Sequence, residues 1–252
     1  MASNVRLDVS TEEWNARVSL AAALRLAALD GWDDLVMAHM SARVPGTSDE
    51  FLIIPTELAF DEITASSLHK IDGQGRLLCS SPYAPHKFAF ALHMPTYRRL
   101  PAAACIIHLH SRAGTSVSMQ KHGLLPSSQY ALWLGAVSYL DYGGHIANLE
   151  EGERIAHAFG SAKVLMMRCH GTMTWGESIP HAYLLTWVLT RACENQLLAL
   201  AGQNELYQPT ADVIARTPEQ AKSITAVDAV FGLQNWNAAL RRLERVAPEY
   251  KT

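Results

Sequence analysis

The sequence predicts an α/β fold in which helices and a central sheet form three layers. Segments with helical apolar spacing alternate with short strand-like segments along the chain, which is typical of mixed α/β domains. The 252 residues are 49% hydrophobic and 18% charged, which is enough apolar material for one large core or two small ones. Since no repeat, low-complexity run or clear linker divides the chain, we expect a single domain over residues 1–252.

The first third of the chain predicts a helix followed by short strands. Residues 10–31 carry apolar side chains at helical spacing, Ser10 and Glu13 fit a capping box, and Gly31 ends the run. Strand-like segments separated by turn-forming residues follow this helix. The expected elements are strands at 36–44 and 51–55, a helical turn at 61–67, and a strand, turn and strand at 70–79.

The middle of the chain predicts a continued alternation of helices and strands. Residues 84–100 are expected to form a helix, with Pro95 as a kink or break. The apolar run at 104–109 is expected to be a buried strand. The elements expected after it are short helices at 114–120 and 130–136, a strand at 137–142, a helix at 149–159 and a strand at 163–168.

The C-terminal part predicts two helices with a polar connector between them. Residues 180–201 are strongly apolar at helical spacing, and Gly202 ends the helix. Residues 203–218 are polar and are expected to connect it to an amphipathic helix at 219–246. We therefore expect residues 203–252 to be a C-terminal connector and helix of the same domain.

Two histidines at the end of the apolar strand are the first candidates for a functional site. Side chains alternate between the two faces of a strand, so His108 and His110 point to the same side. His170 follows the apolar strand at 163–168 and precedes Gly171. A third imidazole from a neighbouring strand end would complete a three-histidine set, which leaves coordination positions open for water or substrate.

These three histidines predict one divalent metal ion, which could be Zn, Mn or Fe(II) because imidazole suits several metals. Neutral ligands leave the full charge of the ion in place. That charge favours a small anionic, chelating substrate such as a hydroxy, keto or amino acid. An isolated HxH pair is more often structural than metal-binding, but the strand-end position and the third histidine favour the metal.

Charge and cysteine content limit the other classes of function. The net charge is −3 and no basic stripe is present, so we expect no nucleic-acid partner. The apolar runs are too short to span a membrane, and Met1 to Asp8 lack the basic-then-apolar pattern of a signal peptide. The four cysteines form no CxxC pair, which is typical of a reduced, cytoplasmic protein.

Longer motifs around the histidines resemble the class II aldolase/adducin family. The segments PAAACIIHLHS at 101–111 and CHGTMTWGES at 169–178 are similar to its joint HxH and histidine-glycine pattern, and other segments resemble its bacterial adducin-like branch. The resemblance covers about residues 12–201. It implies a mainly antiparallel central sheet flanked by helices, a homotetramer with active sites at subunit interfaces, and a divalent metal on His108, His110 and His170.

The sequence departs from the family pattern at several functional positions. The glutamate that aldolases of the family place in the helix before HxH, as an acid/base, corresponds to Ala89. The Gly-Asn turn that binds phosphate in the sugar-phosphate members corresponds to Ala38-His39, and Glu57 stands where glycine is usual. Because a carboxylate repels phosphate, we expect an unphosphorylated substrate. Cys169 replaces the asparagine that normally precedes the histidine-glycine pair.

Other residues of the family's active site have counterparts here. Tyr130 matches the tyrosine that aldolases place across the subunit interface as a proton donor, although an ordinary interface tyrosine would give the same pattern. The residues expected to contact substrate are His39, Ser41, Thr56 and Cys169.

Three functions remain open on these observations. The first is a metal-dependent lyase that cleaves a C–C bond of a small carboxylic acid by decarboxylation or retro-aldol chemistry; decarboxylation fits the missing glutamate better because it requires no base. The second is a non-haem Fe(II), O2-dependent decarboxylating oxygenase on the three-histidine site. The third is a non-enzymatic adducin-like module, which the three intact histidines argue against.

Overall fold

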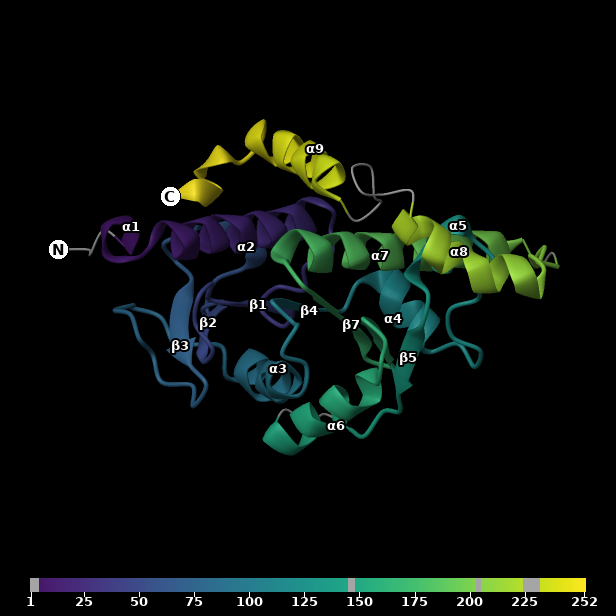
Figure 1. The fold of residues 1–252 in the computed structure, drawn as a ribbon, viewed down its shortest axis with the longest axis horizontal. Coiled ribbons are helices and arrows are strands. Elements are labelled where there is room, and N and C mark those ends of the chain that lie inside the picture. The colour runs from purple at the N-terminus through teal and green to yellow at the C-terminus, as the bar shows by residue number, and fades with distance from the viewer. Residues whose placement is uncertain (1–4, 145–147, 203–204, 224–231) are drawn as a thin grey trace.

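A seven-stranded sheet lies at the centre of the part of the chain that the computed structural model describes, residues 5–144, 148–202, 205–223 and 232–252 (Figure 1). The strand order is β3-β2-β1-β4-β7-β6-β5, and neighbouring strands are antiparallel except for the parallel pair β5 and β6. The predicted α/β fold with a mainly antiparallel sheet is thereby confirmed. The strands are β1 (His39–Arg43), β2 (Glu50–Ile53), β3 (His69–Asp72), β4 (Cys105–Leu109), β5 (Val137–Leu140), β6 (Val164–Met167) and β7 (Gly171–Gly176).

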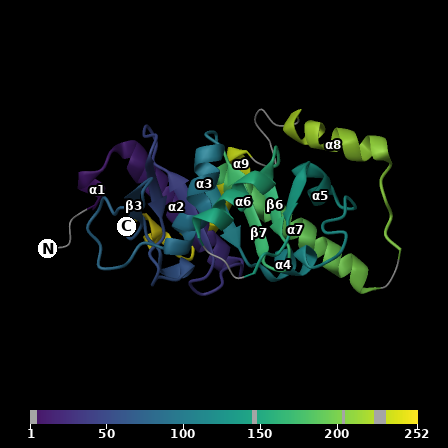
Figure 2. The ribbon, with the colours of Figure 1, turned by 90° about the horizontal axis from the view of Figure 1, so that it is seen from below.

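Helices cover both faces of the sheet and give the three layers. One face carries α2 (Thr11–Leu29) and α7 (Ile179–Ala201), and the other carries α3 (Lys87–Arg99) and α6 (Leu149–Phe159) (Figure 1). Helix α9 (Leu233–Glu244) packs on the outside of α2 and α7, and α8 packs against α5 at the end of the molecule away from α1 (Figure 2). The remaining helical elements are α1 (Val5–Asp8), α4 (Arg112–Ser118), α5 (Gln129–Leu134), α8 (Ala211–Ser223), η1 (Phe60–Glu62) and η2 (Pro248–Lys251). None of the described helices is both long and apolar enough to cross a membrane.

Strand β4 divides its side chains between two cores. Cys105, Ile107 and Leu109 pack in the core under α2 and α7, whereas Ile106 packs in the core under α3 and α6. Because side chains alternate along a strand, His108 faces the same side as Ile106. Strand β1 alternates in the same way, since Met40 and Ala42 lie in the first core. The odd-numbered residues of β1 therefore face α3.

The structure corrects the predicted elements near the N-terminus. Ser10 caps α2 as expected, because its hydroxyl accepts a hydrogen bond from the Glu13 amide. The reciprocal half of the capping box is absent among the described contacts, since the Glu13 carboxylate instead binds Arg17 and Lys70. The predicted strand at 36–44 is shorter, because residues 36–38 belong to the loop before β1. The predicted second strand of 70–79 is only an isolated bridge beside β3.

Larger corrections concern the C-terminal half. Strand β7 was not predicted, because its alternating threonines interrupt the apolar run that marks the other buried strands. The expected polar connector at 203–218 is wrong in part, since α8 begins at Ala211; a mostly polar segment forms a helix there where it can pack against α5. The last helix begins at Leu233 and ends at Glu244, and residues 224–231 of the predicted helix lie outside the described part of the chain.

Helices α3 and α6 approach closely at a proline. Helix α3 continues through Pro95 to Arg99, so the proline does not end it. Proline lacks the amide that would bond to the carbonyl four residues earlier, which is that of Ala91. Gly152 of α6 lies against this same carbonyl, and a Cβ built on Gly152 would lie 2.2 Å from Ala91 O and 2.7 Å from Pro95 Cγ. The absence of a side chain at Gly152 therefore sets the distance between the two helices.

We expect Gly152→Ala to destabilise the protein by about 1–3 kcal/mol, because the added methyl group must push α6 away from α3. Urea denaturation followed by circular dichroism measures the loss. Glu153→Ala, on the exposed side of the same helix, is the control and should change the free energy of unfolding by less than about 0.5 kcal/mol. Equal stabilities of the two variants would contradict the packing argument.

Candidate metal centre

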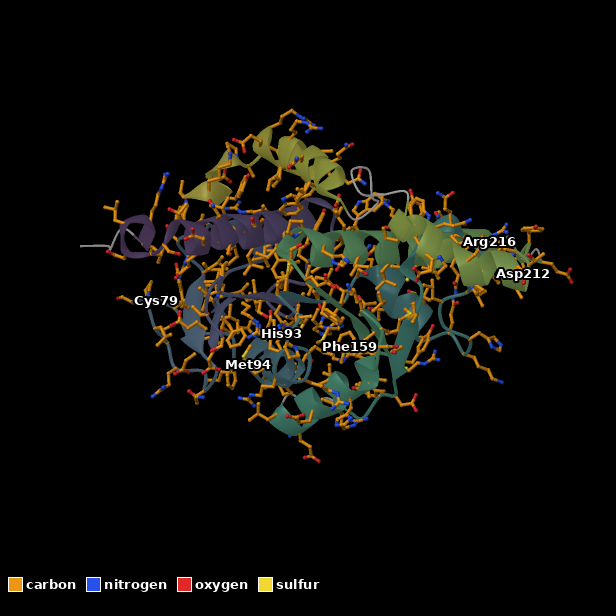
Figure 3. The ribbon with its side chains drawn as sticks, in the orientation of Figure 1. Cys79, His93, Met94, Phe159, Asp212 and Arg216 are labelled. Carbon is orange, nitrogen blue, oxygen red and sulfur yellow. The ribbon has the colours of Figure 1, made fainter. Side chains whose placement is uncertain are left out.

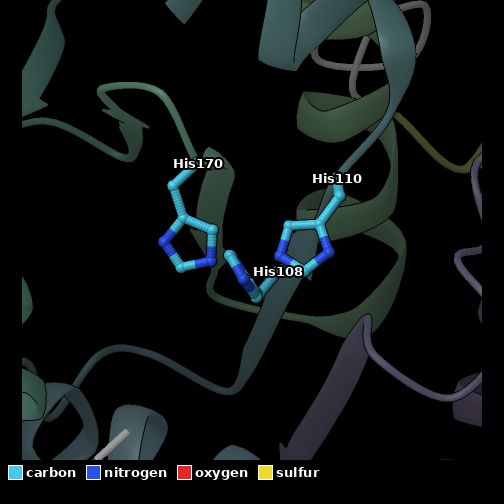
Figure 4. Close-up of side chains that lie close together, drawn as sticks. All are labelled: His108, His110 and His170. Carbon is cyan, nitrogen blue, oxygen red and sulfur yellow. The ribbon is translucent and has the colours of Figure 1, made fainter. Parts of the chain in front are cut away.

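Three imidazoles converge where the central strand β4 ends (Figure 4). His108 and His110 come from the end of β4 and the residue after it, and His170 comes from the turn between β6 and β7. One nitrogen of each ring lies within 4.8 Å of those of the other two. The ring centroids are 4.7 Å apart for His108 and His110, 4.9 Å for His108 and His170, and 5.0 Å for His110 and His170. The structure thus brings together the three histidines that the sequence singled out.

Strand register explains why His170 reaches the other two histidines. Leu109 of β4 pairs with Thr172 of β7, so the turn before β7 lies beside the end of β4. Met167 and Gly171 pair across this turn, which leaves only residues 168–170 to reverse the chain. Cys169 accordingly has a positive φ of 58°. Asparagine, the residue that the family resemblance leads us to expect here, adopts this left-handed conformation more readily than cysteine does.

Hydrogen bonds show which ring nitrogen of His108 and which of His110 carries the hydrogen. His108 Nδ1 lies 3.0 Å from the carbonyl oxygen of Thr172, and His110 Nδ1 lies 2.9 Å from Oδ2 of Asp34. Carbonyl and carboxylate oxygens only accept, so both Nδ1 atoms carry the hydrogen, and the Nε2 atom of each ring in its neutral form carries a lone pair. His110 Nε2 is buried without a hydrogen-bond partner among the described residues. A buried lone pair beside two further imidazoles fits a cation, so the residues present suit a divalent metal.

Asp34 is the site residue that sequence reasoning missed. It lies in the loop between α2 and β1 and is far from His110 in the sequence. A carboxylate behind a metal-binding histidine orients the ring and increases its basicity. The acidic pair Asp33-Asp34 before a strand was the available signal, but it gains meaning only when the pairing of β1 with β4 is known.

A second group of imidazoles lies behind the three histidines. His39 is opposite His108 in the register of β1 and β4, and its ring centroid lies 4.8 Å from that of His108, 4.7 Å from His93 and 5.1 Å from His86. Burial lowers the pKa of His39 and His108 well below the usual value, and neighbouring imidazoles lower both further. Burial also lowers the pKa of His93 to about 3. These rings are neutral at physiological pH, as ligands and hydrogen-bond acceptors must be.

The position of the missing glutamate is filled by apolar packing and a helix cap. Ala89 is fully buried in the first turn of α3. Its amide donates to Nδ1 of His86, which caps the helix, and His86 Nε2 donates to the carbonyl of Val36. Among the described residues, the group that could hold a metal contains the three histidines and no carboxylate. The structure therefore offers no direct substitute for the glutamate as a ligand.

The predicted substrate contacts lie in different environments. Ser41 is fully buried, and its hydroxyl contacts His93 and Tyr97 rather than open space. Thr56 is half-buried, with its amide bonded to the Ala84 carbonyl. Cys169 is exposed in the turn next to His170. His39 is buried beside His108, as described above.

Tyr130 does not lie with the histidines of its own chain. Its side chain lines a cavity of about 370 Å³ between α5, α7 and α9. The centroid of its ring lies 5.3 Å from the ring centroid of Trp133 and 5.7 Å from that of Trp187. None of the three converging histidines lines this cavity. A role for Tyr130 at a metal centre would therefore require a neighbouring subunit.

Comparison with known proteins identifies the family. The class II aldolase and adducin N-terminal domain family matches residues 18–197, so the chain belongs to this family. A protein of Pseudomonas aeruginosa with a provisional aldolase class 2 name is 40% identical over 100% of this chain and 97% of its own length. Alpha-adducin of Rattus norvegicus is 42% identical, but the match covers 74% of this chain and 26% of that protein. The family includes metal-dependent aldolases.

Solved structures agree with this assignment. The crystal structure of an aldolase II superfamily protein from Pseudomonas syringae superposes with a TM-score of 0.93 at 40% identity, over 99% of this chain and 100% of that one. The L-fuculose 1-phosphate aldolase of Glaciozyma antarctica has a TM-score of 0.84 at 24% identity, over 100% of this chain and 96% of that one, which shows a shared fold.

We expect the stability of the metal-free protein to fall on acidification. His93 has a folded-state pKa of about 3, so below its unfolded pKa of 6.5 the unfolded chain binds the proton and the folded chain does not. The stability contributed by the neutral ring is lost as the pH falls below 6.5, by about 2 kcal/mol at pH 5. Urea denaturation at pH 7.5, 6 and 5 measures the change.

His93→Gln should reduce this pH dependence, because the substituted side chain does not titrate. His122→Gln, which alters an exposed histidine, is the control and should keep the dependence of the wild-type protein. An unchanged slope in His93→Gln would show that other groups cause the acid sensitivity.

Proposed function

We propose that the protein is a divalent-metal-dependent enzyme that cleaves a C–C bond of a small, unphosphorylated carboxylic acid. In this proposal His108, His110 and His170 bind the ion, which is Zn, Mn or Fe(II). The observation that carries it is the convergence of three imidazoles, two of them with Nδ1 engaged and Nε2 left with a lone pair. A bound ion would hold the substrate carboxylate with an adjacent oxygen and stabilise the negative charge left by cleavage.

The surroundings of the histidines support an unphosphorylated substrate. The exposed Glu57 stands where the family's phosphate turn has glycine, and its carboxylate accepts hydrogen bonds from the amide of Ala84. A row of rings extends from His108 through His39 and His86 to Phe88, with the last two centroids 6.0 Å apart. Aromatic and neutral groups suit a carboxylic acid with a compact body better than a dianionic phosphate.

Tyr130 enters the proposal as a proton donor from a neighbouring subunit. Its phenol would donate to the carbon from which the leaving group departs. The position of Tyr130 away from the histidines of its own chain supports this arrangement, in which a homotetramer places active sites at subunit interfaces. We also propose a cytoplasmic location, which the four unpaired cysteines favour.

Elemental analysis combined with an anaerobic activity assay tests the proposal. Protein purified without chelators should contain about one divalent ion per chain, and protein reconstituted with Zn2+ or Mn2+ should cleave members of a panel of 2-hydroxy and 2-oxo acids without oxygen. Variants His108→Ala and His170→Ala should lose both metal and activity. Activity that depends strictly on O2 and Fe(II) would overturn the lyase and favour a decarboxylating oxygenase. An empty site without turnover would favour a non-enzymatic adducin-like module.

Asp34 provides a separate prediction for the metal centre. Asp34→Asn should weaken Zn2+ binding about 10- to 100-fold, because His110 loses the carboxylate that orients its ring. Competition with a chromophoric chelator measures the dissociation constant. Asp33→Asn changes the neighbouring, exposed carboxylate and should leave the affinity unchanged. Equal affinities of the two variants would contradict the role of Asp34.

A further inference from the structure

A buried hydrogen-bond chain runs from the candidate metal centre into the core between β1 and α3. His39 Nδ1 lies 2.9 Å from His93 Nε2, and His93 Nδ1 lies 2.7 Å from Ser41 Oγ. Ser41 Oγ lies 3.0 Å from the hydroxyl of Tyr97, which donates to the Ser41 carbonyl at 2.9 Å. All four residues are buried, and His93 lies between α3 and the sheet (Figure 3).

The carbonyl at the far end fixes the direction of this chain. It can only accept, so the single hydroxyl hydrogen of Tyr97 is used there. The oxygen of Tyr97 is then an acceptor, and the hydroxyl of Ser41 donates to it. Ser41 Oγ in turn accepts from Nδ1–H of His93. His93 Nε2 is left with a lone pair and accepts from Nδ1–H of His39.

The opposite direction leaves a repulsive contact. If Ser41 donated to His93 while Tyr97 kept its hydrogen bond to the carbonyl, no hydrogen would lie between the oxygens of Ser41 and Tyr97, which are 3.0 Å apart. Two lone pairs would then face each other in a buried, low-dielectric environment. With Tyr97 donating to the carbonyl, the direction from Tyr97 towards His39 satisfies the hydroxyls of Tyr97 and Ser41 and both ring nitrogens of His93.

The direction of these hydrogen bonds determines whether His39 Nε2 is a donor or an acceptor towards a ligand. With its hydrogen on Nδ1, Nε2 carries a lone pair, and the hydrogen bond described for the His39 side chain is made by Nδ1. The ring lies beside His108 and opposite it in the strand register. We infer that the chain from Tyr97 holds His39 as a hydrogen-bond acceptor at the metal centre, so that the site selects a 2-hydroxy acid over a 2-oxo acid. The ligand class rests on the proposed function, but the direction of the chain does not.

A hydroxyl can donate a hydrogen bond to His39 Nε2, whereas a carbonyl cannot. The hydroxyl of a 2-hydroxy acid can donate to His39 Nε2, whereas the oxygen of a 2-oxo acid would bring a second lone pair to it. A site built for a hydrogen bond rejects the ligand that cannot form it, because a buried polar group is then left unpaired. Tyr97, Ser41 and His93 are positioning residues in this scheme, since they act through His39.

The histidine tautomers test the direction in the metal-free protein. Long-range 1H–15N NMR spectra of 15N-histidine-labelled protein at pH 7.5 should show His39 and His93 with hydrogen on Nδ1. Tyr97→Phe removes the acceptor for the Ser41 hydroxyl, so Ser41 donates to His93 and the chain reverses. Both histidines should then carry the hydrogen on Nε2. Tyr183→Phe, which alters a buried tyrosine on the other face of the sheet, should leave both tautomers unchanged.

The relative affinities for a 2-hydroxy acid and a 2-oxo acid test the role of His39 in ligand selection. We expect the Zn2+-loaded wild-type protein to bind lactate more tightly than pyruvate, and Tyr97→Phe to reduce this preference about tenfold, as expected for one hydrogen bond. Isothermal titration calorimetry measures both affinities. Nε2 tautomers in the wild-type protein would overturn the direction, and this measurement needs no variant if Tyr97→Phe does not fold. If the tautomers reverse in Tyr97→Phe but the preference for lactate over pyruvate stays the same, the role of His39 in ligand selection is overturned. If the wild-type protein does not bind Zn2+, only the proposed function is refuted.

Discussion

The antiparallel pairing of β4 with β1 and β7 is the constraint on which the candidate site depends. Leu109 pairs with Thr172, so the turn that carries His170 lies at the end of β4. His39 pairs with His108 on the other side, which places a further imidazole behind the first. A shift of one residue in either pairing would turn these side chains to the opposite face. The packed cores on both faces of β4 prevent such a shift, because its neighbouring residues are fully buried on alternate sides.

Burial then determines the chemical state of the imidazoles. A charged ring is costly in this environment, so the rings remain neutral and their hydrogens must go to acceptors. The Thr172 carbonyl takes the hydrogen of His108 and Asp34 takes that of His110, and the hydroxyls of Ser41 and Tyr97 orient the rings behind them. The same physical requirement, that a buried N–H or O–H group finds an acceptor, places the hydrogens of His108 and His110 on Nδ1 and sets the polarity of the inner chain.

The divergence from the sugar-phosphate aldolases is concentrated on the α3 side of the sheet. Ala89 replaces the expected acid/base, and the imidazole of His86 bonds to its amide. His39 stands where the family resemblance leads us to expect a phosphate-binding asparagine, and its Nδ1 lies 2.9 Å from His93 Nε2. His108, His110 and His170 match the family's histidine motifs, whereas alanine stands at the expected acid/base position and a neutral imidazole at the expected asparagine.

The sequence by itself determined the α/β class, most of the helices and strands, and the three histidines, because apolar periodicity and the HxH spacing are local properties. The family was also evident from the motifs around those histidines, and the comparisons confirmed it. Strand β7, helix α8, the carboxylate behind His110 and the direction of the chain from Tyr97 to His39 were decided only by tertiary structure. These features depend on partners that are distant in the chain, since a threonine-rich strand, a polar helix or a lone aspartate acquires its role from the group that folding places beside it.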